Sequence, residues 1–277
     1  MTDRENIAQY YDEHADYEYA RLERSPLHES EWLLSRELLD EYITPGTSVL
    51  DLGAGPGRYA EYLIRQKRCF VGVVDLSRAS LDLFLRRLDE TAKARVLFAR
   101  EGCATAIDDI REAQFDAVLL MGPLYHLLTD RERIVAVHQS HRVLKPGGIL
   151  FAAFVSPYYL VRRALLSEPS ILDSPEIKNA FAGDGFVPLS LHENFTDHWC
   201  CWPHQAKTLM EQNGFETLRL RNLEGLGSFL RDEQTRMLQD VERKQAWFNL
   251  LRLTCENPDL LGATIHFAYV GIKTRQT

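Results

Sequence analysis

VLDLGAGPGR, residues 49–58, is the stretch of sequence that decides the fold of this chain. Its apolar first half is typical of a buried strand, and its glycines predict a loop that opens a helix. Such a loop brings backbone N–H groups close to a ligand. A second apolar run, residues 70–74, ends at Asp75, where a carboxylate can bind both hydroxyls of a ribose. We therefore expect the chain to bind a nucleoside cofactor.

Apolar runs and helical periods alternate on either side of this loop. That alternation is typical of a parallel sheet with helices on both faces, so we expect an α/β fold with a doubly wound, Rossmann-like sheet. Residues 5–43 carry helical apolar spacing, which predicts two helices before the first strand. The expected strands are 48–52, 70–75, 95–99, 115–121, 148–154, 215–220 and 263–272, and the expected helices between them are 57–67, 78–91, 130–144 and 203–213.

Two segments interrupt the alternation. Residues 157–202 mix helical and irregular sequence, and residues 228–256 carry a second helical pattern. We expect an N-terminal helical lid over residues 1–46 and one domain over residues 47–277, with inserts at 157–202 and 222–260. Inserts of this kind commonly shape a substrate pocket.

The composition favours a cytoplasmic protein with a large core. Of the 277 residues, 45% are hydrophobic, and the five cysteines include no CxxC pair, which argues against a disulfide scaffold or a zinc ribbon. The N-terminus is polar and no apolar run is long enough to span a bilayer, so neither export nor a membrane partner is expected. The net charge of −8 disfavours a broad nucleic-acid surface, although a local basic patch could hold a structured RNA.

Position 58 separates two classes of nucleoside cofactor. A dinucleotide fingerprint, G-x-G-x-x-G, requires a third glycine where this chain has Arg58. The pattern Asp51-x-Gly53-x-Gly55-x-Gly57 instead resembles motif I of the class I S-adenosylmethionine-dependent methyltransferases.

Further motifs extend this resemblance over residues 45–155 in the expected order. Residues 74–77 resemble the second motif of the family, residues 115–120 resemble its fourth strand, and residues 142–148 resemble its turn into the fifth strand. The closing strands of the chain resemble the sixth and seventh strands of the family. The resemblance therefore implies a seven-stranded, mostly parallel sheet with an antiparallel last strand.

The resemblance also implies S-adenosylmethionine as the cofactor. In this family the glycine loop wraps the methionine part of the cofactor, and the acidic residue after the second strand holds the ribose. The residues implied here are Asp51, Gly53, Ala54 and Gly55 in the loop, Asp75 and Leu76 after the second strand, Cys103 and Ala104 after the third, and Met121 after the fourth. Cys103 departs from the family, which often has an aspartate that accepts from the adenine amino group. Since cysteine is a poor acceptor, backbone groups and apolar contacts would hold adenine instead.

The loop after the fourth strand, residues 121–127, would face both the methyl group and the acceptor. Methyl transfer from a sulfonium is an in-line displacement in which alignment supplies most of the catalysis, and a base is needed only if the acceptor carries a proton. We predict His126 as that base because its ordinary pKa lies near neutrality, and Tyr125 as a residue that orients the acceptor or the cofactor. His126 could instead cap a helix, fix the loop or stack on adenine. Tyr11 is predicted to contact the cofactor from the N-terminal lid.

His198 and Trp199 are the predicted substrate-binding residues at the pocket mouth. The aromatic side chains of the inserts suit a partly apolar, small-molecule acceptor. The same segment contains several residues of the types that bind zinc. Their spacing matches no familiar zinc site, so no metal is expected. These residues are His192, His198, Cys200, Cys201 and His204.

Three alternatives stay open on the sequence alone. Residues 213–267 resemble a bacterial methyltransferase of a carboxylated wobble uridine in tRNA, which would need a basic channel. A nicotinamide-dependent oxidoreductase is disfavoured by the glycine spacing, and a non-catalytic S-adenosylmethionine-binding protein is the third alternative. Also open are the acceptor atom (O, N, C or S), the need for a base and the formation of a homodimer. The basic channel would consist of Arg162, Arg163, Lys178, Arg219 and Arg221.

Overall fold

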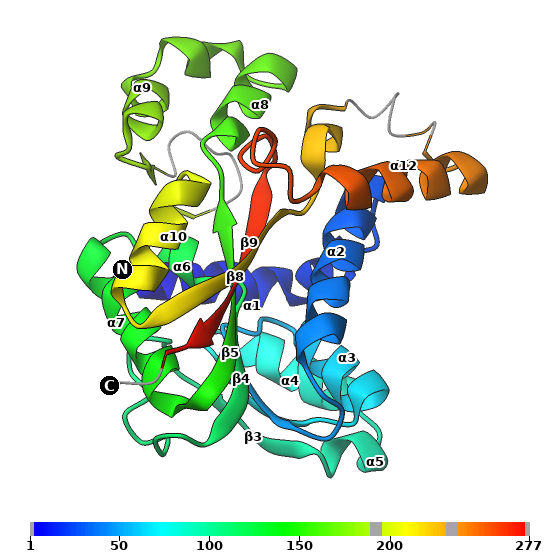
Figure 1. The fold of residues 1–277 in the computed structure, drawn as a ribbon, viewed down its shortest axis with the longest axis vertical. Helices are drawn as coiled ribbons and strands as arrows, with labels where there is room; N and C mark the ends of the chain where they lie inside the picture. Colours follow the sequence, from blue (N-terminus) through cyan, green and yellow to red (C-terminus); the bar gives the residue numbers. More distant parts are fainter. Residues whose placement is uncertain (1–2, 189–195, 231–235, 237, 275–277) are drawn as a thin grey trace.

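The computed structural model describes residues 3–188, 196–230, 236 and 238–274 (Figure 1). They form a seven-stranded sheet in the order β3-β2-β1-β4-β5-β9-β8. β9 pairs antiparallel with both β5 and β8, and the other four strand pairs are parallel, which confirms the expected doubly wound sheet with an antiparallel last strand. The strands are β1 (Ser48–Leu52), β2 (Phe70–Asp75), β3 (Val96–Glu101), β4 (Phe115–Leu120), β5 (Leu144–Val155), β8 (Phe215–Asn222) and β9 (His266–Lys273).

Helices cover both faces of this sheet, and each face has its own apolar core. Val49 of β1 packs into one core and Leu50 into the other, and both side chains are fully buried. A strand that is buried on both faces explains the unbroken apolar run before the glycine loop. The first core is closed by α2 (Pro26–Tyr42), α3 (Arg58–Lys67), α4 (Arg78–Arg87) and α12 (Val241–Thr254), and the second by α7 (Asp130–Val143) and α10 (Pro203–Gln212).

Helix α1 (Asp3–Arg21) and the two inserts make up much of the rest of the described chain. Helix α1 packs on α4, and the insert after β5 forms a separate layer at the top of Figure 1. Within the described part of the chain, no helix is both long and apolar enough to cross a membrane. The insert comprises α8 (Tyr158–Leu166), η1 (Pro169–Asp173), α9 (Pro175–Ala182), β6 (Phe186–Val187) and β7 (His198–Trp199), and the later insert contains η3 (Gly225–Phe229) before α12.

The expected helix over residues 78–91 is wrong in its extent. The structure has α4 up to Arg87 and a separate α5 (Glu90–Lys93), because Leu88 adopts an extended conformation. The Asp89 side chain then accepts a hydrogen bond from the backbone N–H of Ala92 and begins the new helix.

The strand order indicates at which edge of the sheet a ligand would bind. β1 lies between β2 and β4, so the strand order reverses there and the loops after these strands diverge to opposite sides. In doubly wound sheets ligands bind in the crevice at this point, beyond the carboxyl ends of the strands. The antiparallel pairing of β9 with β5 sets His266 opposite Val155 and so brings the start of β9 to the same edge.

Candidate functional site

The loop between β1 and α3 depends on glycines for two different reasons. Gly53, Gly55 and Gly57 all have positive φ, at 68°, 52° and 77°. A Cβ atom at Gly53 would overlap the ring of Pro123, and one at Gly57 would overlap the ring of Phe84. A Cβ at Gly55 would meet no atom within 4 Å, because this residue borders open space. Two glycines therefore permit close packing, and the third borders a cavity.

A cavity lies against this loop at the carboxyl edge of the sheet. Helix α1 forms one of its walls, and the short helix α6 (Pro123–His126) after β4 forms another. All residues predicted to bind the cofactor and both predicted catalytic residues line this one cavity: Tyr11, Asp51, Gly53, Ala54, Gly55, Asp75, Leu76, Cys103, Ala104, Met121, Tyr125 and His126.

Two buried carboxyl groups lie beside the glycine loop, Asp51 near the end of β1 and Asp75 at the end of β2. The carboxylate of Asp75 accepts hydrogen bonds from the backbone N–H of Gly55 at 2.6 Å and of Ser77 at 2.8 Å. Asp51 is 1% exposed, and its Oδ2 atom has no hydrogen-bond partner among the described residues. Burial, together with the nearby charge of Asp75, raises the pKa of Asp51 to about 8. In the ligand-free protein the carboxyl is therefore largely protonated at neutral pH, and a cationic ligand group beside its unsatisfied oxygen would favour the charged form.

Comparisons with known proteins agree with this geometry. The model of a family described as "Methyltransferase domain" matches residues 49–148, which include the glycine loop, Asp75 and the strands up to β5. Residues 49–148 thus form a methyltransferase domain, and the sheet has the Rossmann-like strand order of S-adenosylmethionine-dependent methyltransferases.

Relatives of this methyltransferase match it over part of their length. "Probable tRNA methyltransferase 9B" is 30% identical in Homo sapiens and 29% in Bos taurus, in each case over 142 residues, or 50% of this chain. The chain covers only 27% of the length of each of these relatives.

Solved structures share the fold along almost the whole chain. A methyltransferase in complex with the Haloferax volcanii Trm112 methyltransferase activator superposes with a TM-score of 0.61 at 16% identity, covering 96% of this chain and 98% of that one. The 1,6-didemethyltoxoflavin-N1-methyltransferase of Burkholderia thailandensis superposes with a TM-score of 0.57 at 16% identity, covering 98% of this chain and 87% of that one.

The residues of the cavity fit S-adenosylmethionine, the cofactor of this family. The cofactor carries an ammonium group, which can donate a hydrogen bond to the unsatisfied oxygen of Asp51. The open space beside Gly55 leaves room for a ligand against the loop. Cys103 also lines the cavity, where its sulfur accepts a hydrogen bond from the Thr105 hydroxyl at 3.2 Å.

Replacing Asp51 by asparagine is expected to stabilise the ligand-free methyltransferase at alkaline pH while weakening its cofactor binding. Since the folded-state pKa of Asp51 is raised, the folded protein holds a proton that the unfolded chain releases between pH 4 and 8, and stability falls as pH rises through that range. In thermal denaturation, Asp51→Asn should melt at least about 2 °C above the wild type at pH 8.5, with a smaller gain at pH 5. A lower melting temperature than the wild type at pH 8.5 would contradict this assignment.

Helix α1 is attached to the cavity at two points. The Asp12 carboxylate accepts hydrogen bonds from the Ser77 hydroxyl at 2.6 Å and from the Ala79 backbone N–H at 3.0 Å. The preceding residue, Tyr11, has its hydroxyl hydrogen-bonded to Nε2 of His126 at 2.9 Å. The helix is thus held over the cofactor cavity from both sides.

The ring of His126 makes hydrogen bonds through both nitrogens. Nε2 pairs with Tyr11, and Nδ1 pairs with the Thr196 hydroxyl at 3.0 Å. Burial lowers the pKa of His126 to about 3, so the ring is neutral at physiological pH and a weak proton acceptor. This geometry supports an anchoring role better than the predicted role as a base, which stays a prediction.

The predicted substrate residues lie outside the lining of this cavity. His198 is 1% exposed on β7, and its Nδ1 lies 3.3 Å from the Thr196 carbonyl oxygen. The Arg133 guanidinium lies over the ring of Trp199 at 3.8 Å. Their substrate-binding roles stay predictions. His192, from the considered zinc set, falls outside the described residues.

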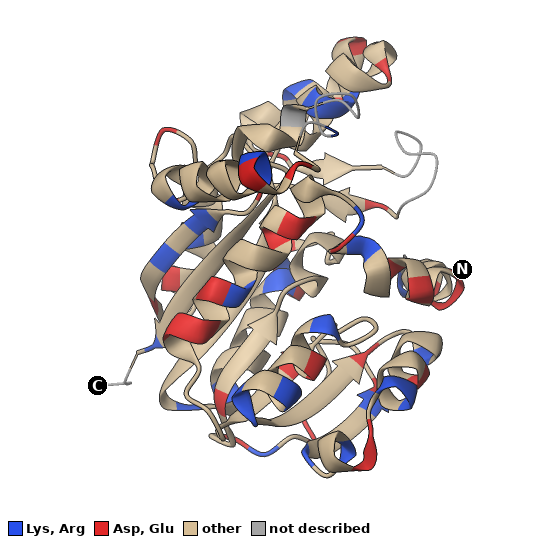
Figure 2. Ribbon diagram, turned by 90° about the vertical axis from the view of Figure 1, so that its right-hand side faces the viewer, with Lys and Arg blue, Asp and Glu red and all other residues tan. Residues whose placement is uncertain are grey.

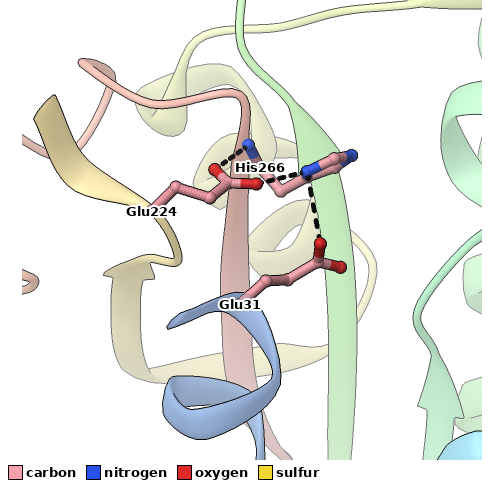
Figure 3. Close-up of side chains that lie close together, drawn as sticks. All are labelled: Glu31, Glu224 and His266. Carbon is pink, nitrogen blue, oxygen red and sulfur yellow. Dashed lines mark hydrogen bonds and ion pairs between the residues drawn. The ribbon is translucent and has the colours of Figure 1, made fainter. Parts of the chain in front are cut away.

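Sequence reasoning missed a buried network of charged side chains beside the cavity. Arg21 at the end of α1 lines the cavity and donates to both oxygens of Glu31 on α2, at 2.6 and 2.9 Å. Glu31 Oε2 lies 3.9 Å from Nδ1 of His266, which is bonded to Glu224 (Figure 3). No local motif indicated this network, because its members come from four segments that only the fold brings together.

Proposed function

We propose that this methyltransferase transfers the methyl group of S-adenosylmethionine to a small-molecule acceptor. The observation that carries the proposal is the attachment of α1 over the cofactor cavity through Asp12 and Tyr11. A macromolecular acceptor would have to displace this helix, whereas a small acceptor can share the enclosed space beneath it. We also propose that residues 1–46 act as the lid of this site.

Each lining residue has a proposed task in binding. Asp75 would accept from the ribose hydroxyls, and Asp51 with the backbone of Gly53 and Gly55 would hold the methionine part. The Cys103–Ala104 segment would flank the adenine. The bound cofactor supplies an activated methyl group, and these contacts align it for in-line attack by the acceptor.

Tyr125 is proposed to orient the acceptor as a hydrogen-bond donor. Its ring lies within the cavity lining, and burial raises the pKa of its hydroxyl above the ordinary value of 10.0. The hydroxyl therefore keeps its proton at neutral pH and can donate it to a lone pair.

Methylation of tRNA is the second candidate, and the names of the human and bovine relatives favour it. The distribution of charged side chains argues against methylation of tRNA. None of the five basic residues proposed for a channel lines the cavity, and Arg163, Arg219 and Arg221 pair with Glu168, Glu41 and Glu256 at 2.7, 3.0 and 2.5 Å. Figure 2 shows Lys and Arg interspersed with Asp and Glu rather than gathered on one face.

A binding experiment tests this second candidate. We expect bulk tRNA to be retained by the immobilised protein neither at low nor at high salt, because phosphate binding needs clustered positive charge. Salt-sensitive retention of tRNA, accompanied by transfer of label from S-adenosylmethionine to it, would replace the small-molecule proposal.

We further propose a cytoplasmic location, supported by the cysteines. All five are free, and Cys69, Cys200, Cys201 and Cys255 are buried. Free buried thiols suit a reducing compartment.

A further inference from the structure

His266 lies at the edge of the sheet where the acceptor would bind. It begins β9 and pairs with Val155 at the end of β5. Its ring centroid lies 6.4 Å from that of Tyr125, which lines the cofactor cavity. A fifth of its side chain is exposed. The ring therefore lies next to Tyr125, just outside the lining of the cavity, and is partly exposed.

Glu224 fixes the orientation of this ring. Its Oε1 atom lies 2.6 Å from Nδ1 of His266. Its Oε2 atom accepts from the Thr264 hydroxyl at 2.6 Å and from the backbone N–H groups of Ile265 and His266 at 3.1 and 2.8 Å. The carboxylate, 2% exposed, is thus fully occupied and cannot rotate away from the ring.

This arrangement decides which ring nitrogen is available. A carboxylate beside Nδ1 favours the proton on Nδ1 and leaves the lone pair on Nε2. Nε2 points away from both Glu224 and Glu31 in Figure 3, and no described residue forms a hydrogen bond with it. His126, in contrast, uses both nitrogens in hydrogen bonds.

Glu31, Glu224 and His266 lie close enough together to suggest a cation site, but their partners argue against one. Arg21 already occupies both oxygens of Glu31, and Glu224 has no free oxygen. A cation would have to displace a buried guanidinium, which is costly.

We propose that His266, oriented by Glu224, removes the proton from the acceptor during methyl transfer. This inference rests on the proposed function. It requires an acceptor whose reacting nitrogen or oxygen carries a proton at neutral pH. The lone pair of that atom forms the bond to the methyl carbon, the carbon–sulfur bond breaks with its electron pair going to sulfur, and the acceptor proton passes to Nε2 and then to water. The charge of the sulfonium is thereby neutralised, and one proton is released.

The charges around His266 set the expected pH dependence. Burial opposes a charge on the ring, but Glu224 after β8 and Glu31 on α2 outweigh it and raise the pKa of His266 above 6.5. The positive charge of Arg21 on α1 lowers the pKa of His266. Glu18 on α1 and His28 on α2 also interact with this ring. Since the base works in its neutral form, the rate should rise with pH through this raised pKa.

The test uses His266→Asn, because the asparagine amide can still donate to Glu224 but has no atom in place of Nε2. The full chain is incubated with S-adenosylmethionine labelled in the methyl group and a small-molecule extract. We expect His266→Asn to transfer label at least about 100-fold more slowly than the wild type, with unchanged affinity for S-adenosylhomocysteine by calorimetry. Glu224→Gln, which loses the charge that orients the ring and raises its pKa, should transfer label more slowly and move the rise of its pH profile to lower pH. Exposed His204→Asn is the matched control and should match the wild type.

A second readout needs no turnover. In ¹⁵N-histidine spectra of the ligand-free protein, the neutral ring of His266 should carry its proton on Nδ1, and its pKa should fall in Glu224→Gln. A proton on Nε2 in the neutral ring would overturn the proposal, as would equal transfer by the wild type and His266→Asn. No transfer by the wild type would instead reject the proposed function, and the role of His266 with it. The labelled product's NMR spectrum distinguishes N-methyl from O-methyl groups.

Discussion

Asp75→Ala is expected to weaken the binding of S-adenosylmethionine and S-adenosylhomocysteine by at least about 100-fold. A hydrogen bond to a charged group contributes about 1.5–3 kcal/mol, and a ribose offers two hydroxyls to this carboxylate. Asp75 is 7% exposed and lines the cavity, so water cannot easily replace it. Calorimetric titration of both ligands measures the effect directly.

Asp82→Ala is the matched control for this prediction. Asp82 lies on the neighbouring helix α4, pairs with Arg78 at 3.0 Å on the surface, and does not line the cavity. Its replacement should leave both affinities within about twofold of the wild type, as is usual for surface positions. If Asp75→Ala bound the cofactor as tightly as Asp82→Ala does, the ribose would lie elsewhere.

Gly55→Ala is expected to lose cofactor binding by at least about tenfold while the protein stays folded. The new methyl group would meet no protein atom within 4 Å, so it occupies only the space proposed for the ligand. The positive φ of 52° adds a conformational cost of about 1–2 kcal/mol. Melting temperature and affinity for S-adenosylhomocysteine are measured on the same preparation.

Gly147→Ala separates the effect of a methyl group in the ligand space from the effect of backbone strain. Gly147 also has a positive φ, 74°, and open space around its Cβ position, but it does not line the cavity. We expect a similar loss of melting temperature and no loss of affinity. Equal losses of affinity in both variants would mean that strain in the backbone, rather than contact with the ligand, explains the result for Gly55.

The sheet and the cofactor cavity could be predicted because their signals are local. Each strand is a short apolar run, and the residues of the cavity follow directly on strand ends, where parallel strands bring their loops together. Asp51 and Asp75 each stand in such a motif. The split of the expected helix at Leu88 could not be seen, because helical spacing continues across the break and only the conformations of Leu88 and Asp89 end it.

The pairing of Tyr11 with His126 and the charged network could not be predicted, because each joins residues from segments far apart in the sequence. Tyr11 and His126 are 115 positions apart, and Glu31 lies far in sequence from both Glu224 and His266. No local pattern links these residues to one another. Their contacts depend on the packing of α1 and α2 against β9 and the segment after β8, which only the tertiary structure shows.

Transfer of labelled methyl groups to separated fractions tests the central claim most directly. The protein is incubated with methyl-labelled S-adenosylmethionine and a whole-cell extract, which is then divided into small molecules, RNA and protein, with Asp75→Ala as the inactive control. We expect label in the small-molecule fraction that depends on the wild-type protein and is absent with Asp75→Ala. Label confined to RNA, or no transfer by a wild type that binds S-adenosylhomocysteine, would contradict it.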